Sequence, residues 1–202
     1  KKTGIVLDRK LKNIILNEHE FAAGKIVLKS YPRQLHILLN SKCNLQCEMC
    51  GMFKGRYKFS DRHFKELIKL MPYLQLLIIQ GGEIFLDSRI NTILKYALKN
   101  KVKVDLLTNG LLINEKIADQ LADAGVNLVF SIDSPFKETY ESIRLGAKFE
   151  KLINNIIILN EARKLKKTCI KTAINMVVMK KNYKHIEAMI EFSKKYKFNA
   201  LI

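Results

Sequence analysis

The sequence has no apolar run of the roughly 18 residues that a membrane-spanning helix needs, so no membrane span is expected. No apolar stretch follows the opening Lys1-Lys2-Thr3, so no signal peptide is predicted, and the missing initial Met favours a trimmed or partial product. There is also no low-complexity linker. With 202 residues, of which 48% are hydrophobic and 27% charged, the chain has the composition of one globular domain.

Acidic residues are few: 19 stand against 36 lysines and arginines, which gives a net charge of +17. Such a charge can indicate a nucleic-acid surface. However, 29 of the basic residues are lysines, and they are spread along the chain instead of being clustered. We therefore do not expect nucleic-acid binding. Two explanations of the charge remain: a general bias in composition, or a basic rim that attracts an acidic electron-transfer partner.

Cysteines are also few, and three of the four lie within eight residues, at Cys43, Cys47 and Cys50. A secreted disulfide framework distributes its cysteines through a small, loop-rich domain. The observed clustering instead favours a metal site in a protein of the reducing cytoplasm. Cys169 lies far downstream, at the start of a predicted strand, and is expected to be a small buried core residue.

Apolar runs of strand length alternate with segments of helical periodicity. The predicted strands are Gln34–Asn40, Leu74–Gln80, Val102–Leu107, Val126–Ile132, Cys169–Met179 and Asn199–Ile202. The predicted helices are Asp61–Met71, Asp87–Lys99, Asn114–Ala124, Lys148–Lys167 and Tyr183–Lys197. This α/β alternation with continuous apolar strands predicts a parallel sheet covered by helices, either a β/α barrel or, as the runner-up, a doubly wound sheet.

Two regions are expected. Residues 1–30 form an N-terminal extension with a helix at Lys10–Asn17 and a short strand at Lys25–Lys29. Residues 31–202 form the barrel, which is expected to be incomplete at its C-terminal end because the chain stops in the sixth strand.

The cysteine segment follows the first strand directly, which places it at the carboxyl ends of the strands, where barrel enzymes carry their chemistry. Structural zinc usually takes four ligands in two separated pairs, and no second pair is present. A 4Fe–4S cluster normally takes four thiolates, and three would leave one iron open to another ligand. A structural zinc loop remains the alternative at this point.

The spacing C-x3-C-x2-C after a first strand resembles the radical S-adenosylmethionine (radical SAM) superfamily. Further matching segments lie at later strand ends or within the fifth strand, in the family's order: Gln80-Gly81-Gly82-Glu83, Thr108-Asn109-Gly110, Ser131-Ile132-Asp133 and Ala173-Ile174-Asn175-Met176. The resemblance covers about residues 34–202. It implies a partial (β/α)6-type TIM barrel with a 4Fe–4S cluster and S-adenosylmethionine as cofactors.

The resemblance also implies roles for individual residues. Cys43, Cys47 and Cys50 are expected to hold the cluster, with the amine and carboxylate of S-adenosylmethionine on the open iron. Gly81 and Gly82 are expected to let the backbone approach the cofactor closely, and Glu83 to accept a hydrogen bond from its ammonium group. The remaining cofactor contacts are expected from Gln80, Ser131 and Arg144, with orienting roles for Asn109, Asp133 and Asn175. Met49 stands where the family commonly has an aromatic residue against adenine, and its thioether is expected to fill that position.

The implied activity is reductive cleavage of S-adenosylmethionine to a 5′-deoxyadenosyl radical, which abstracts hydrogen from a substrate. The expected partners are a low-potential electron donor of the flavodoxin or ferredoxin type and a substrate that is a peptide, a protein or a small metabolite. The segment around the cysteines looks most like members with a C-terminal SPASM or twitch domain that holds auxiliary clusters, and such a domain is not expected within residues 1–202. A non-catalytic iron–sulfur protein acting in electron transfer or nucleic-acid binding is the alternative.

Overall fold

A computed structural model describes residues 8–51, 56–167 and 170–202. Within these ranges, six parallel strands form the main sheet: β1 (Gln34–Leu38), β3 (Leu76–Gln80), β4 (Lys103–Thr108), β5 (Asn127–Ser131), β7 (Thr172–Asn175) and β8 (Ala200–Leu201). Two very short strands, β2 (Gln46–Cys47) and β6 (Arg144–Leu145), form a separate antiparallel pair.

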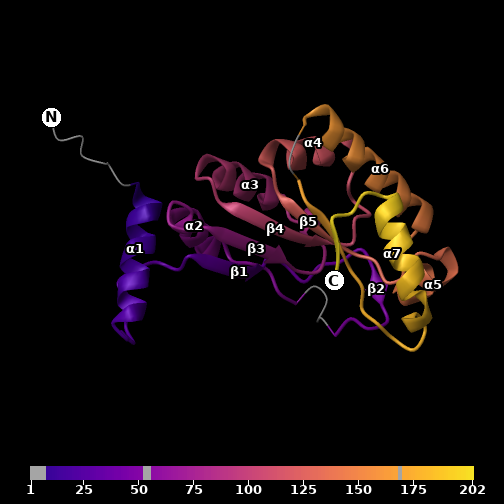
Figure 1. The fold of residues 1–202 in the computed structure, drawn as a ribbon, viewed down its shortest axis with the longest axis horizontal. Coiled ribbons are helices and arrows are strands. Elements are labelled where there is room, and N and C mark those ends of the chain that lie inside the picture. Colours follow the sequence, from indigo (N-terminus) through magenta and orange to yellow (C-terminus); the bar gives the residue numbers. More distant parts are fainter. Residues whose placement is uncertain (1–7, 52–55, 168–169) are drawn as a thin grey trace.

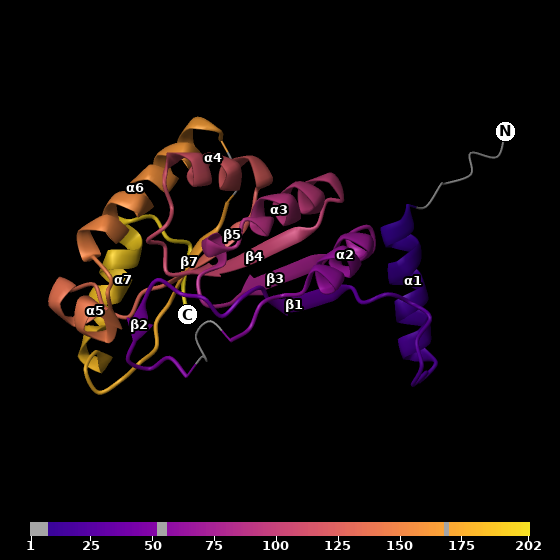
Figure 2. The same cartoon turned by 180° about the vertical axis from the view of Figure 1, so that it is seen from behind.

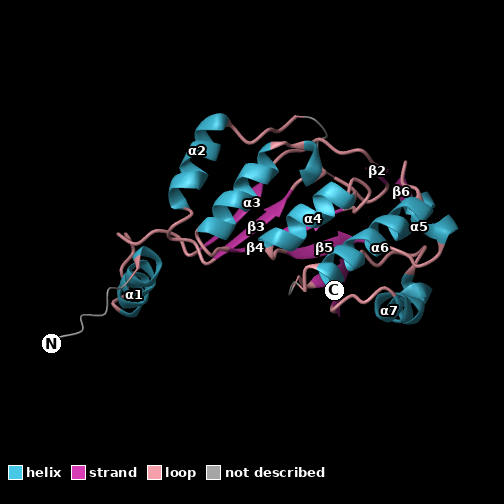
Figure 3. Ribbon diagram, turned by 90° about the horizontal axis from the view of Figure 1, so that it is seen from above, coloured by secondary structure: helices cyan, strands magenta, loops and turns pink. Residues whose placement is uncertain are grey.

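Helix α1 (Arg9–Ala22) precedes β1. The other helices lie between successive strands: α2 (Asp61–Leu70), α3 (Arg89–Lys99), α4 (Glu115–Ala124), α5 (Lys137–Ile143), α6 (Phe149–Leu165) and α7 (Ile186–Lys195). Two 3-10 turns, η1 (Ile84–Leu86) and η2 (Tyr183–His185), follow β3 and precede α7. Helices α2, α3, α4 and α6 lie along the outside of the curved sheet, whereas α1 stands apart beyond β1 (Figures 1 and 2). The view from above shows the same layering (Figure 3).

The strand order is β1-β3-β4-β5-β7-β8, so each strand of the main sheet pairs with the next one along the chain. A doubly wound sheet reverses its strand order in the middle, and this sheet does not. The runner-up architecture is therefore wrong, and the predicted α/β partial barrel is confirmed. The register places Leu38 beside Gln80 and Ser131 beside Asn175, so the carboxyl ends of the strands meet at one edge.

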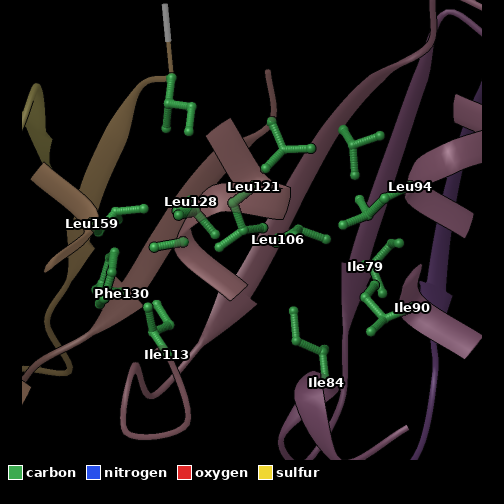
Figure 4. Packing of buried hydrophobic residues seen from close by; sticks show 14 of the residues in the cluster. Ile79, Ile84, Ile90, Leu94, Leu106, Ile113, Leu121, Leu128, Phe130 and Leu159 are labelled. Atoms are coloured by element: carbon green, nitrogen blue, oxygen red, sulfur yellow. The ribbon is translucent and has the colours of Figure 1, made fainter. Parts of the chain in front are cut away.

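Alternation along the strands divides the side chains between two sides of the sheet. Ile79, Leu106, Leu128 and Phe130 are buried beneath the helices, where they form the core with Ile90 and Leu94 of α3, Leu121 of α4 and Leu159 of α6 (Figure 4). The intervening residues are only half-buried. The inner surface therefore stays accessible near the strand ends.

Helix boundaries follow local chemistry. The Ser60 hydroxyl accepts a hydrogen bond from the backbone of His63 at 3.1 Å, and the Asn114 side chain accepts one from Ile117 at 2.9 Å, so both residues cap the helices that follow them. Helix α4 ends at Gly125, which adopts the left-handed conformation with φ of 62°.

The predicted strand at Lys25–Lys29 is wrong: the chain bends there, and the side chain of Ile26 is 98% exposed. The reason is a set of hydrogen bonds between helix α1 and the residues that follow this segment. The buried Glu20 carboxylate accepts hydrogen bonds from the backbone of Lys29 and Ser30, at 2.8 and 3.0 Å, and turns the chain back toward α1. The preceding helix is correspondingly longer than predicted and runs to Ala22.

Two further differences lie downstream. The predicted strand Cys169–Met179 is reduced to Thr172–Asn175, and Cys169 itself lies outside the described residues. The buried Asn182 side chain bonds the backbone of Met179 and Val177, which holds the chain after β7 in a loop. Helix α5 was not predicted. No helix in the described part of the chain is long and apolar enough to cross a membrane.

Candidate functional site: a cavity between the cysteine loop and the strand ends

The cysteine loop lies beyond β1 and is fastened at its centre by the β2–β6 pair. Cys47 pairs with Arg144 across this ladder, and the backbone of Glu48 donates to the carbonyl of Ile143 at 2.9 Å. Cys43 and Cys47 are half-buried, and Cys50 is exposed. Burial raises the pKa of the Cys47 thiol, although the nearby positive charge of Arg144 acts in the opposite direction.

A cavity of about 270 Å³ separates this loop from the strand ends. Its wall contains the three cysteines and seven other residues named from the sequence: Met49, Gln80, Gly81, Gly82, Asn109, Ser131 and Arg144. It also contains four residues that were not predicted as site residues: Ser41, Leu45, Leu107 and Thr108. Leu107 and Ser131 occupy inward positions of neighbouring strands, so strand alternation was the signal that could have identified Leu107.

The two adjacent glycines allow close contact between two loops. A Cβ on Gly81 would lie 2.4 Å from the carbonyl oxygen of Asn40, and one on Gly82 would lie 2.0 Å from that of Lys42. The backbone of Gly82 donates to the Asn40 carbonyl at 2.8 Å, and that of Glu83 to the Lys42 carbonyl at 2.7 Å. We expected the absence of a side chain to serve the cofactor. In the structure it serves the loop that leads to Cys43.

The Glu83 side chain is fully buried and does not belong to the cavity wall. Its carboxylate accepts hydrogen bonds from the Thr108 hydroxyl at 2.8 Å and from the backbone of Asn109 at 2.9 Å. Burial raises the pKa of Glu83, and these hydrogen bonds partly offset that effect. In the structure this carboxylate ties β3 to β4, and its expected contact with an ammonium group stays a prediction.

Arg144 and Asp133 form a buried ion pair, with 2.7 Å between Nε and Oδ2 and side-chain exposures of 7% and 0%. Arg144 reaches the cavity wall, and its Nη1 lies 3.7 Å from the Cys47 sulfur. Asp133 does not reach the wall; its other oxygen accepts a hydrogen bond from the backbone of Val177 at 2.9 Å. The structure therefore makes Asp133 a partner of Arg144 and gives it no direct place in the cavity.

The two asparagines differ in position. The side chain of Asn109 donates to Asn44 at 2.9 Å and accepts from the backbone of Leu111 at 3.0 Å, so it fixes the cysteine loop to the end of β4. Asn175 is half-buried at the end of β7 and does not belong to the cavity wall. The structure therefore places Asn109 in the cavity wall and Asn175 beside the wall residue Ser131, and the orienting role of each stays a prediction.

The donor set fits an iron–sulfur cluster better than a single ion. In residues 8–51, 56–167 and 170–202, no three His, Cys, Asp or Glu side chains gather around one ion position. A cubane cluster binds each thiolate on a different iron, so its ligands stand further apart than the ligands of one zinc ion. Three thiols on one side of a cavity and polar strand ends on the other leave room for a cluster and a second ligand bound to it.

Comparison with known proteins decides the family. The family model described as the Radical SAM superfamily matches residues 37–193, well over half of the chain. The chain belongs to the radical SAM superfamily. Members of this family are enzymes that use a 4Fe–4S cluster and S-adenosylmethionine, so the resemblance seen in the sequence is confirmed.

Relatives of this radical SAM chain have several different activities. It is 31% identical over 169 residues to the "Probable GTP 3',8-cyclase" of Methanocaldococcus jannaschii, with 79% of this chain and 54% of the relative covered. It is 28% identical over 178 residues to the "AdoMet-dependent heme synthase" of Methanosarcina barkeri, with 84% and 49% covered. The chain thus spans about half the length of these curated relatives.

Solved structures agree on the fold. Streptococcus suis SuiB matches with a TM-score of 0.73 and 21% identity, covering 99% of this chain and 46% of SuiB. Native anSMEcpe with bound AdoMet matches with a TM-score of 0.70 and 23% identity, covering 84% and 50%. At these identities the similarity establishes the radical SAM partial barrel and nothing further.

Proposed function

We propose that this radical SAM chain binds a 4Fe–4S cluster through Cys43, Cys47 and Cys50 and S-adenosylmethionine in the cavity beside them. The observation that carries the proposal is the shared cavity: the three thiols and the polar ends of β3, β4 and β5 face the same space. Held there, the cluster and S-adenosylmethionine would together supply one-electron reductive cleavage of the sulfonium and, from it, hydrogen-atom abstraction from the substrate.

Each wall residue has a task that its chemistry permits. Gln80 and Ser131 offer hydrogen-bonding groups at neighbouring strand ends to the nucleoside and methionyl parts. Arg144 offers a guanidinium to a carboxylate. Because the Glu83 carboxylate is already hydrogen-bonded to Thr108 and Asn109, we assign the ammonium group to carbonyl oxygens of the Gly81–Gly82 backbone, which lies in the wall. Met49 supplies a polarizable apolar contact for adenine.

We propose a peptide or protein as the substrate class. SuiB bound to the precursor peptide SuiA and anSMEcpe bound to the Cp18Cys peptide are both similar in fold, which supports this class. The relatives named for GTP and heme favour a small metabolite as the rival. Two observations would favour the peptide. The first is a gene for a short precursor peptide beside the gene of this protein. The second is a change in the mass of that peptide after incubation with the full-length protein, S-adenosylmethionine and a reductant.

The electron is proposed to come from a low-potential donor of the flavodoxin or ferredoxin type, whose acidic surface would complement the net charge of +17. Three unpaired thiols at an oxygen-sensitive site favour a reducing compartment, the cytoplasm, as the location of the protein.

The central test is anaerobic reconstitution followed by iron and sulfide analysis, EPR and assay of 5′-deoxyadenosine after addition of dithionite and S-adenosylmethionine. The expected result is a cluster signal and 5′-deoxyadenosine well above a Cys47→Ala control. A protein that takes up zinc and gives no cluster signal would contradict the proposal. The assay is repeated on the full-length protein, because the chain covers only about half of its relatives.

A further inference from the structure

A buried positive charge lies directly beneath one of the three cysteines. The Nη1 atom of Arg144 is 3.7 Å from the Cys47 sulfur, within hydrogen-bonding distance for a sulfur acceptor. The Arg144 side chain is only 7% exposed, so solvent screens this charge weakly. Family resemblance implies a contact of Arg144 with S-adenosylmethionine, and the contact with the cysteine sulfur is additional to that.

The position of the charge is fixed from two sides. On one side the backbone of Arg144 pairs with that of Cys47 in the β2–β6 ladder, so the sulfur and the guanidinium share one short element. On the other side Asp133 holds Nε at 2.7 Å. Asp133 is itself anchored, because its carboxylate accepts from the backbone of Val177 and its carbonyl accepts from the buried Asn182 side chain at 2.8 Å.

We infer that Arg144 and Asp133 together set the reduction potential of the cluster at Cys43, Cys47 and Cys50, with Arg144 favouring the reduced state and Asp133 acting as its positioning residue. This inference rests on the proposed function, because it requires the cluster. Reduction by one external electron makes the cluster more negative by one charge. Hydrogen bonds to the sulfurs, local charge and solvent exposure are the means by which a protein adjusts such a potential.

The two members of the pair are expected to act with opposite signs. Replacing Arg144 with a neutral residue leaves the negative Asp133 near the cluster and removes an N–H donor from the Cys47 sulfur, so reduction becomes harder. Replacing Asp133 with Asn keeps a side chain of nearly the same shape beside Nε but leaves the guanidinium uncompensated, so reduction becomes easier. A purely structural role for the pair has no reason to produce this sign reversal.

The test is an EPR-monitored redox titration of the reconstituted protein with dithionite, without S-adenosylmethionine, so that any contact between Arg144 and the cofactor does not contribute. For Arg144→Gln we expect the ratio of reduced to oxidised cluster at a fixed potential to fall about tenfold, which is a midpoint lowered by about 59 mV for a one-electron couple. For Asp133→Asn we expect the midpoint to rise. Arg144→Lys retains the charge and is expected to stay closer to wild type than Arg144→Gln.

The matched control is the ion pair of Arg89 with Asp87, at 2.6 Å and with side-chain exposures of 16% and 11%. Neither residue belongs to the wall of the cysteine cavity, so Arg89→Gln and Asp87→Asn are expected to leave the midpoint unchanged. Equal shifts in both pairs, or shifts of the same sign for Arg144→Gln and Asp133→Asn, would overturn the inference.

Loss of the cluster is a separate result. A wild-type protein that assembles no cluster would contradict the proposed function, whereas an assembled cluster with an unchanged midpoint in both variants would contradict only the role of the pair. If Arg144→Gln does not retain iron, the inference is tested on Asp133→Asn alone. The midpoint potential of Asp133→Asn must then lie above the midpoints of wild type and of Arg144→Lys.

Discussion

The carboxylate of Glu83 accepts a hydrogen bond of 2.9 Å from the backbone of Asn109, so the glutamate that ends the Gly-Gly-Glu motif fastens two strand ends together. The same carboxylate accepts from the Thr108 hydroxyl. Because these donors are buried, they depend on Glu83 for their hydrogen bonds.

Replacing Glu83 with Ala should therefore destabilise the protein before any cofactor is involved. Two buried donors would lose a charged acceptor, at a cost of about 3 kcal/mol in the free energy of unfolding. Urea denaturation of the cluster-free protein measures this value. If Glu83→Ala unfolds like wild type but no longer binds S-adenosylmethionine, the carboxylate acts on the cofactor after all.

The pH dependence of stability gives an independent test of Glu83. Burial raises its pKa in the folded protein, so the folded state binds the proton more tightly than the unfolded state. Stability contributed by this group is present at low pH and is lost as pH rises above the ordinary glutamate value of about 4.3 toward the folded pKa. The stability of wild type relative to Glu83→Gln should fall as pH rises through this window; a difference that rises with pH would show that the carboxylate is stabilised in its ionised form.

Gly82 should tolerate no side chain. In Gly82→Ala the new Cβ would meet the Lys42 carbonyl, which belongs to backbone and cannot move without displacing the loop of Cys43. We expect a loss of at least about 2 kcal/mol in unfolding free energy and lower iron content after reconstitution. Gly51→Ala is the matched control, because no described atom lies within 4 Å of a Cβ there. Equal iron content in both variants would contradict this account.

Tyr140 is a buried residue whose hydroxyl has no hydrogen-bond partner in the described structure. Removing this hydroxyl leaves no other polar group without a partner, and it removes the free-energy cost of burying the hydroxyl away from water. Tyr140→Phe should therefore be as stable as wild type or more stable by up to about 1 kcal/mol. Thermal or chemical unfolding of the cluster-free protein checks this, and a clear loss of stability would indicate a partner for the hydroxyl, such as a buried water.

Asn182 should be the most sensitive position in the loop after β7. Its fully buried side chain bonds the backbone at Asp133, Val177 and Met179, and in Asn182→Ala these three groups lose their partner. We expect a loss of about 3 kcal/mol. Asn114→Ala, which removes only the cap of α4, should cost about 1 kcal/mol. Similar losses for the two variants would contradict the bracing role of Asn182.

The sheet and the cavity could be predicted because their signals are local. Apolar runs such as Leu76–Gln80 form strands in a βα chain, and parallel strands place their carboxyl ends at one edge. Cysteines and polar residues that follow such runs therefore meet, as Cys43, Gln80 and Ser131 do.

The remaining features depend on contacts that no local pattern records. The β2–β6 pair consists of two residues in each strand, too few for any periodicity, and it joins Cys47 to a residue 97 positions away. The residue types of Gly81 and Gly82 predict a close approach but not the partner that approaches. Likewise, the Glu83 motif gives no side-chain direction, and only packing turns its carboxylate toward β4.

The β2–β6 pair also determines when the site can form during synthesis. Cys47 has no strand partner until Arg144 has left the ribosome, by which time β1, β3, β4 and β5 have already emerged. A chain grows by about 5–20 residues each second, so several seconds pass between the synthesis of the cysteine loop and that of the strand it pairs with. The strand pairing that holds Cys47 therefore forms only after four strands of the main sheet have been synthesised.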